Sequence, residues 1–463
     1  MAKRAFLFGC LFLATNQTAC QSFAGVKPMS LEWEKATLRE APEASFELTL
    51  YQDNWALVTD ARPLELGRGR QLVRFSGIPP QTVGKGAYLQ VPASVEGRRF
   101  RYDLSNKEHL LEKYDGKTVV ISDATSSLTA QLIWTGSGPV YRIGDRLYPE
   151  PPGKVSLPEL PGIALTPFLE WLIEPPESWS GIATASYQVE SLGWTNEYTL
   201  ITNEEQSRGD WKQWAALSNA SGKAYEKARV TLVAGNVKRI HPPFPMYYGG
   251  ARAMAEDASV EAFAGRYQYR LPGFFDLGKK AEERVALSER KNAPIERVFR
   301  VEGGVSLFLQ PDPELPRKAR IRLHLDNPLG EPMPSGKVTV YSPGSDGKLA
   351  IAGEPSIPDT PKSQRLVLDL GEAFDVTFTR TQTAYRLFEE QTEVSTLIKL
   401  KNDQKFPITV EVIEQASGDW TVTESSLPYE KISTTQLRFQ LRLDAESERD
   451  LSYTVAVKRE RRQ

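Results

Sequence analysis

Three histidines are the first residues to weigh for acid–base or metal chemistry. Imidazole is a frequent general base and zinc ligand, and a metal site needs its ligands at short, regular spacings. His109, His241 and His324 stand far apart in the sequence, and no pair of them has such a spacing. We therefore predict solvated histidines, with neither a metal site nor a bound cofactor.

Paired carboxylates are the next chemistry to test, because a glycosidase holds two of them across one bond. Adjacent glutamates occur at 204–205, 282–283 and 389–390. Neighbours on a strand point to opposite faces, so we expect all three pairs in solvated turns. Gly-x-Ser-x-Gly is absent, and Gly336-Lys337 lacks the following Ser or Thr of a phosphate loop. The sequence therefore assigns no catalytic residue.

Two short motifs are explained most simply as polar turns. Arg208-Gly-Asp210 matches a cell-adhesion tripeptide, and Asn219-Ala-Ser221 matches a glycosylation sequon. Three-residue patterns recur by chance in any long chain. We predict that both motifs are turns between strands.

Aromatic side chains are the more informative group, with nine Trp and seventeen Tyr in the chain. Aromatic faces stack on sugar rings and anchor protein interfaces. Trp194, Tyr198 and Trp420 fall on alternating strand patterns, which predicts packing in the core. Trp211 and Trp214 lie near a charged break, and we take them as candidates for exposure.

The segment from Ile240 to Ala264 is the candidate interaction loop. It breaks every periodicity, and long loops in compact domains are often functional. Its prolines would hold it extended, while Phe244, Tyr247 and Tyr248 offer rigid apolar anchors for a partner. The alternative, which the sequence leaves open, is that these aromatics fold back onto the protein.

Strands must position all of these residues. Apolar and polar side chains alternate from 185 to 239, which predicts a meander of antiparallel strands with a turn at 219–222. The alternation recurs at 319–325, 366–370, 437–443 and 451–457. One buried and one wet face per strand is typical of antiparallel sandwiches. We predict an all-β, mainly antiparallel protein: one or more small N-terminal β domains, then an extended β-sandwich-type domain, with few short helices.

The N-terminal half contains one helix signal and one boundary signal. Ser105 and Glu108 form a capping box that predicts a short helix over 105–114. Strands at 118–121, 128–134 and 140–143 predict a small SH3-like barrel. Eight prolines between Pro149 and Pro176 exclude a helix or a central strand, so 168–173 is expected only as an edge. This places an N-terminal β domain at 45–178 and a sandwich domain at 179–458.

The first residues indicate export. Two basic residues precede the apolar run 5–14, which is the length of a signal-peptide core and too short to span a bilayer. We expect a signal peptide at 1–24 with cleavage after Ala24, and Cys20 is a rival site for lipoprotein-type lipidation. Cys10 and Cys20 are the only cysteines, so the mature body has no disulfide. No later segment is apolar enough to span a membrane, and membrane contact is expected only through the N-terminal lipid.

The charge balance excludes one class of partner. Lys plus Arg (57) nearly equals Asp plus Glu (59), so there is no net field to attract a polyanion. We expect no nucleic-acid partner.

The second half carries a more specific pattern. The segments Gly336–Tyr341, Leu370–Val376 and Ser417–Ser425, with Ser191–Trp194 upstream, resemble the bacterial family catalogued as domain of unknown function 4139, also labelled mucoidy-inhibitor-A-like. The resemblance implies a β-rich, exported protein with no agreed catalytic residues. Many relatives place a coiled coil before this domain, and here only the proline-rich connection is present.

Three functions compete at this stage. The favoured one is an exported, non-catalytic cell-envelope protein, in the periplasm or envelope, that binds a partner protein through sheet edges or loops. The alternatives are a glycan- or cell-wall-binding module and an unrecognised envelope hydrolase. We favour the first because no acid, base and nucleophile converge in the sequence.

Overall fold

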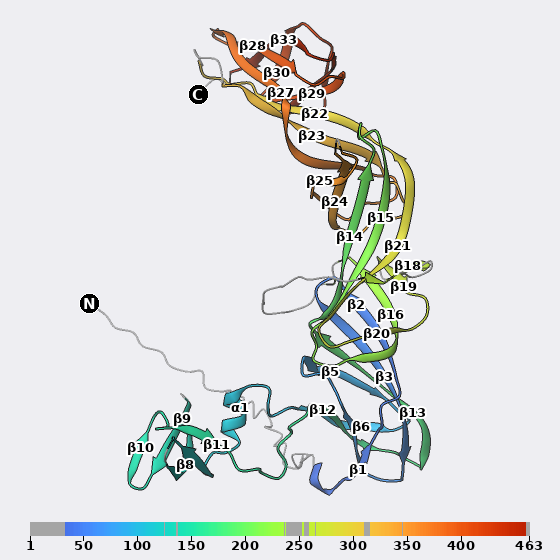
Figure 1. The fold of residues 1–463 in the computed structure, drawn as a ribbon, viewed down its shortest axis with the longest axis vertical. Coiled ribbons are helices and arrows are strands. Elements are labelled where there is room, and N and C mark those ends of the chain that lie inside the picture. The colour runs from blue at the N-terminus through green and yellow to red at the C-terminus, as the bar shows by residue number, and fades with distance from the viewer. Residues whose placement is uncertain are drawn as a thin grey trace, which may run out of the picture.

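The computed structural model describes residues 33–124, 126–135, 138–235, 237, 252–253, 259–263, 265–309, 315–344 and 346–459. About 65% of the chain is strand and 2% is helix, so the predicted all-β class is confirmed. Figure 1 shows an elongated molecule whose sheets follow one another along its long axis, with the C-terminal strands at one end. None of the described helices is long and apolar enough to cross a membrane.

The first part of the molecule packs two sheets against one core. The smaller sheet has the order β1 (Thr37–Glu40), β4 (Gln71–Ser76), β12 (Phe168–Glu174) and β6 (Ser94–Arg101). The larger sheet has the order β18 (Ser259–Phe263), β19 (Arg266–Arg270), β16 (Tyr225–Ala234), β2 (Ser45–Tyr51), β3 (Trp55–Leu66), β13 (Trp179–Glu190) and β5 (Thr82–Gln90), with β20 (Phe275–Leu277) on β16. Phe75 and Trp171 from one sheet share a core with Leu48 and Tyr187 from the other.

The strand β12 was expected as an edge, and this prediction is wrong. It lies between β4 and β6, and Pro175 follows its last residue instead of interrupting it. Glu170 in its middle is fully buried. Its carboxylate accepts hydrogen bonds from Arg74 Nε at 2.8 Å and Arg99 Nε at 2.5 Å. Paired in this way, a charge is tolerated in a central strand.

Strands from both sides of residue 178 share the larger sheet. β13 pairs antiparallel with β3 along its whole length, and β16 pairs parallel with β2. The expected domain boundary therefore falls between two strands, β12 and β13, that pack on the same core.

The middle of the molecule is a seven-stranded sheet. Its order is β17 (Arg252–Ala253), β21 (Ala281–Pro294), β15 (Arg208–Asn219), β14 (Leu192–Thr202), β24 (Gly336–Pro343) and β25 (Leu349–Gly353), with β26 (Ser356–Ile357) on β24. The long strands β14, β15 and β21 run through the centre of Figure 1. Trp194 on β14 belongs to the first core and Tyr198 on the same strand to the middle core. Single strands thus join two cores.

The predicted meander from 185 to 239 is wrong, although its strands exist. β14 pairs with β15, but β13 and β16 belong to the neighbouring sheet. The chain changes sheets at Ser191, which has a φ of 59°. A residue in the left-handed region of φ/ψ space turns the backbone sharply, so the two strands that flank it in sequence belong to different sheets.

The C-terminal part is a nine-stranded sheet around a third core. Its order is β30 (Trp420–Ser425), β33 (Ser447–Lys458), β28 (Gln391–Asn402), β27 (Arg365–Leu387), β23 (Arg317–Asp326), β22 (Glu296–Gly304), β29 (Ile408–Gln415), β32 (Gln436–Leu443) and β31 (Tyr429–Lys431). β27 also spans two cores: Leu366 packs in the middle core and Phe378 in the C-terminal one. The predicted burial of Trp420 is confirmed.

A small unit, which contains the one α-helix of the described chain, lies beside the elongated stack of sheets in Figure 1. Its sheet order is β10 (Arg146–Tyr148), β9 (Gly138–Ile143), β8 (Ser127–Thr135), β7 (Thr118–Ser122) and β11 (Lys154–Ser156). The helix α1 (Lys107–Glu112) confirms the predicted helix, but its N-cap is Asn106, whose Oδ1 accepts from His109 N at 2.7 Å. The predicted cap at Ser105 is one residue too early. A 3₁₀ turn covers Trp33–Lys35.

Candidate functional site

The two aromatic candidates for exposure on β15 differ in their environment. Trp211 is fully buried in the middle core, so its predicted exposure is wrong. Trp214, three positions on along β15, is half-buried on the outer face, and its Nε1 donates to Thr199 Oγ1 at 3.1 Å. Lys212 and Arg284 lie over its ring, at 4.8 and 5.5 Å from the centroid. Cations therefore cover Trp214, which leaves it a poor platform for a sugar.

Several candidates lie outside the described residues. These are Phe244, Tyr247 and Tyr248 of the interaction loop, and Cys20 with the expected signal peptide at 1–24. They stay predictions.

The histidines lie in unlike environments. His109 is exposed on α1, and its Nδ1 lies 3.0 Å from Ser105 Oγ. His324 on β23 is half-buried, and its Nε2 has no hydrogen-bond partner among the described residues. Burial lowers the pKa of His324, and the charge of Arg365 lowers it further. The prediction of a solvated histidine is wrong for His324. His241 lies outside the described residues.

The glutamate pairs follow the prediction in two of three cases. Residues 204–205 form a turn and 389–390 a bend, both exposed. Residues 282–283 instead lie within β21, opposite Ser218 and Leu217 on β15, so the turn predicted there is wrong. Among the described residues no group of three or more His, Cys, Asp or Glu side chains is placed to hold a metal ion.

The turn predictions for the two short motifs, residues 208–210 and 219–221, have different outcomes. Arg208-Gly-Asp210 opens β15 and is not a turn, which corrects the prediction. Asn219 ends β15 just before a bend at 221–222, but its side chain is buried. Its Nδ2 donates to the carbonyls of Lys223 (2.8 Å), Leu277 (3.2 Å) and Gly278 (3.0 Å). An amide held by three carbonyls is not accessible for glycosylation in the folded protein.

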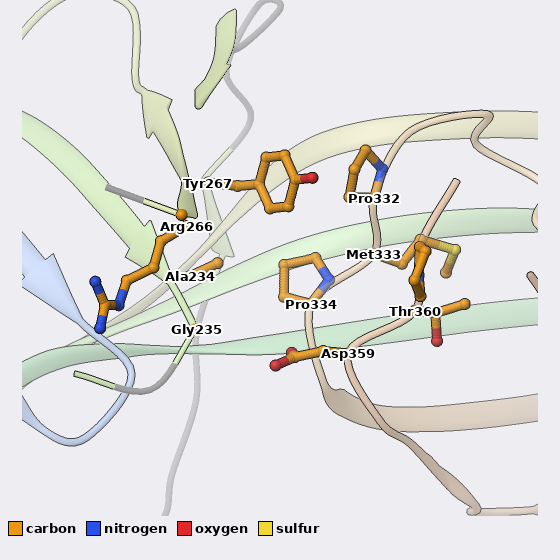
Figure 2. Close-up of a pocket in the computed structure, with 11 residues that line it drawn as sticks. Ala234, Gly235, Arg266, Tyr267, Pro332, Met333, Pro334, Asp359 and Thr360 are labelled. Atoms are coloured by element: carbon orange, nitrogen blue, oxygen red, sulfur yellow. The ribbon is translucent and has the colours of Figure 1, made fainter. Parts of the chain in front are cut away.

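A cavity of about 210 Å³ lies where the larger N-terminal sheet meets the middle sheet (Figure 2). Four separate segments line it: Ala234 and Gly235; Gly265, Arg266 and Tyr267; Pro332, Met333 and Pro334; and Asp359, Thr360 and Pro361. The first two segments are the end of β16 and the start of β19. The last two are loops beside β24 and β26.

The proline loops of this pocket are fixed from behind. Met333 and Thr360 exchange two backbone hydrogen bonds of 2.8 Å each. The carbonyl of Pro334 accepts from Tyr198 Oη at 2.8 Å and Asn196 Nδ2 at 3.0 Å. Because both donors are buried on β14, the wall is anchored to the middle core and is preformed.

The polar groups around the pocket serve mainly its walls. Asp359 Oδ1 accepts from Ser335 N at 2.7 Å. In Figure 2 the guanidinium of Arg266 extends away from the prolines. Burial raises the pKa of Tyr51, and the positive charge of Arg266 opposes this rise. The ring of Tyr267 points toward Pro332, and 38% of this residue is exposed. The pocket therefore offers apolar walls and an aromatic ring, with no acid and base of the described residues aimed at a common point.

Sequence reasoning missed this pocket. Its signal was two short proline-rich segments, 332–334 and 358–361, which interrupt the alternation of the flanking strands. Prolines mark loops, but only the pairing of Met333 with Thr360 brings the two loops together. No protein-family model matches the chain, and no curated protein matches it.

Proposed function

We propose that the chain is an exported, non-catalytic cell-envelope protein that acts by binding a partner protein, and that the pocket around Tyr267 receives an aromatic side chain of that partner. The observation that carries this proposal is a preformed apolar cavity whose walls are held by the core. Export rests on the N-terminal leader and the cysteine-free body. Membership of the domain of unknown function 4139 family rests on the segments quoted above and is part of the same proposal.

The size of the pocket favours a side chain over a small-molecule ligand. Pockets for small molecules usually enclose about 300–1,000 Å³, and this one encloses about 210 Å³. A cavity of about 150 Å³ already accepts benzene. One phenyl or phenol ring therefore fits, and the half-exposed Tyr267 gives it an aromatic neighbour.

The energetics agree with a protein partner. Aromatic anchors that enter preformed pockets carry most of the binding energy in many protein interfaces. Met333 and the three prolines give apolar contact, and they lose little entropy because their loops are already fixed.

Site-specific photo-crosslinking in intact envelopes tests the proposal. A benzoylphenylalanine at Tyr267 should yield one dominant protein adduct, whereas the same group at Tyr429 should not. Tyr429 is the matched control because it is 44% exposed and lies on β31 in the C-terminal sheet. With the partner purified, Tyr267→Ala should weaken binding about 30-fold, the loss of one anchor of about 2 kcal/mol.

Three results would contradict the proposal. Equal adducts at both positions would remove the role of the pocket. Cleavage of an envelope polymer by the purified protein would support the hydrolase alternative instead. Recovery of the unprocessed chain from the cytosol would exclude export.

A glycan-binding function is the second candidate, and a different surface favours it. A groove of about 600 Å³ crosses β2, β16 and β19, and Thr49, Thr231 and Gln268 are among the hydrogen-bonding residues that line it. Calorimetry with soluble cell-wall fragments tests it. Binding lost in Gln268→Ala and kept in Tyr267→Ala would favour the glycan function.

A further inference from the structure

The strand β25 ends the middle sheet and is unprotected. Among the described residues it pairs only with β24, so its other side presents unpaired backbone groups. Natural edge strands usually carry a charge or a proline that blocks further pairing. Leu349-Ala-Ile-Ala-Gly353 carries neither, and Leu349 and Ile351 are 53% and 59% exposed.

The neighbouring strand extends the apolar surface of this edge. Tyr341 lies opposite Ile351, and Pro343 lies opposite Leu349. Both are half-buried, so the exposed face is two strands wide. A one-residue bulge at Ala352 turns that residue toward the middle core. Leu349–Ile351 is the regular part of β25 before the bulge, and in a twofold pairing centred on Ile351 it lies opposite Ile351–Gly353 of the other copy.

Charges at the two ends of β25 specify the orientation of an added strand. Lys348 precedes it and Glu354 follows it, and both side chains reach solvent. If β25 of a second copy paired parallel and in register, Lys348 would lie opposite Lys348 and Glu354 opposite Glu354. In an antiparallel copy centred on Ile351, each Lys348 faces the Glu354 of the other copy. The edge is thus self-complementary about a twofold axis, as a symmetric dimer requires.

We propose that β25 pairs antiparallel with β25 of a second copy of this chain, which joins two middle sheets into one continuous sheet. Backbone hydrogen bonds supply the pairing, and Ile351 packs against its symmetry mate. Each copy contributes only a short strand, so the dimer is weak and its population rises with concentration. This inference is independent of the proposed pocket, which lies on other loops.

Crosslinking tests the register. In the full chain carrying Cys10→Ser and Cys20→Ser, Ile351→Cys should give a covalent dimer with a short thiol-reactive crosslinker. Leu387→Cys is the matched control, because Leu387 is also 59% exposed and lies at the end of β27. Equal yields from the two variants, or no dimer from Ile351→Cys, would overturn the proposal.

Charge reversal tests the orientation by sedimentation equilibrium. Lys348→Glu and Glu354→Lys should each weaken dimerisation about tenfold, since two cross-strand pairs become repulsive. The double variant should restore it. Within the chain Lys348 pairs with Asp346 at 3.2 Å and Glu354 pairs with Lys337 at 2.6 Å, and the double variant still lacks both pairs. Rescue therefore reports the contact between copies. A monomeric wild type, or a dimer insensitive to these charges, would refute the inference.

Discussion

The N-terminal and C-terminal cores each bury an arginine, a carboxylate and a tyrosine, but they assemble them differently. In the first core, Arg62 donates to Asp60 at 2.8 and 2.7 Å, and Tyr187 Oη donates to Asp60 at 3.2 Å. Asp60 and Arg62 stand two apart on β3 and so share one face of that strand.

The C-terminal cluster takes one residue from each of three strands. Arg380 on β27 donates to Glu414 on β29 at 3.3 and 3.1 Å, and to Tyr453 Oη on β33 at 3.2 Å. Local alternation places the first ion pair, whereas the second forms only when distant strands pack together. The comparison teaches that equal chemistry in two cores can depend on contacts of very different range.

Arg62 makes other contacts besides its ion pair with Asp60. Arg62 Nη1 donates to the carbonyl of Ala41 at 2.9 Å, and its guanidinium lies 4.6 Å from the centroid of the Phe75 ring. Glu43 lies 3.9 Å from Arg62 Nη2 as a second carboxylate. These contacts would compensate in part if Asp60 were removed.

Removing the buried carboxylate of each cluster should cause the largest loss in the free energy of unfolding, and the size of the loss should differ between the two clusters. Breaking a buried ion pair costs about 3–5 kcal/mol. We expect Glu414→Ala to lower the free energy of unfolding by about 4 kcal/mol and Asp60→Ala by about 3 kcal/mol, because Arg62 keeps Glu43 nearby. Urea denaturation measures both. Glu302→Ala is the control, because the side chain of Glu302 is 50% exposed where it pairs with Arg300, and a loss there as large as in Glu414→Ala would contradict the argument.

Gly303 should be the position where the C-terminal cluster is most easily overpacked. A Cβ there would lie 2.5 Å from Glu414 Oε1 and 3.0 Å from Arg380 Nε. We expect Gly303→Ala to cost about 2–3 kcal/mol by displacing the ion pair. Gly304→Ala is the matched control, since its Cβ would meet nothing closer than 3.4 Å. Equal unfolding midpoints for the two variants would show that the cluster tolerates the added methyl.

The tyrosine hydroxyls should contribute less than the carboxylates. Tyr187 donates to a carboxylate and Tyr453 accepts from a guanidinium, and hydrogen bonds to charged groups are worth about 1.5–3 kcal/mol. We expect Tyr187→Phe and Tyr453→Phe each to cost about 2 kcal/mol in urea denaturation. Tyr88→Phe, at an exposed position, should cost nothing measurable. A neutral Tyr453→Phe would mean that Arg380 is satisfied without the Tyr453 hydroxyl.

Raising the pH should have the smallest effect on the free energy of unfolding. It tests the two clusters through the ionisation of their tyrosines. Burial raises the pKa of Tyr187 and of Tyr453, and the charges of Asp60 and Glu414 raise them further. Because the folded-state pKa is above the unfolded one, this stability is complete below about pH 10 and declines as pH rises further. Each tyrosine should contribute about 1.4 kcal/mol per pH unit to the decline.

The phenylalanine variants supply the measurement for this pH dependence. Tyr187→Phe and Tyr453→Phe should each reduce the alkaline slope of the unfolding free energy by one proton. Burial also raises the pKa of Tyr269, to about 12, so part of the slope should remain in both variants. An unchanged slope in either variant would show that its tyrosine ionises as freely as in the unfolded chain.

Much of the local structure could be predicted from the sequence. Alternation identified the buried faces of β14 at Tyr198 and of β32 at Phe439, because a strand places every second side chain on one side. The helix α1 and the chain reversal after Asn219 followed from local signals in the same way. Errors arose where a neighbour in sequence is not a neighbour in space, as at Ser191.

The sequence by itself determined the fold class, the buried faces of regularly alternating strands such as β14 and β32, and the position of several turns, because these depend on contacts within a few residues. Tertiary structure alone decided that β12 is central, that Met333 meets Thr360 to wall the pocket, and that Arg380 meets Glu414. The physical reason is that strand order depends on which distant edges and faces pack together, and alternation marks a buried face without naming the residues that cover it.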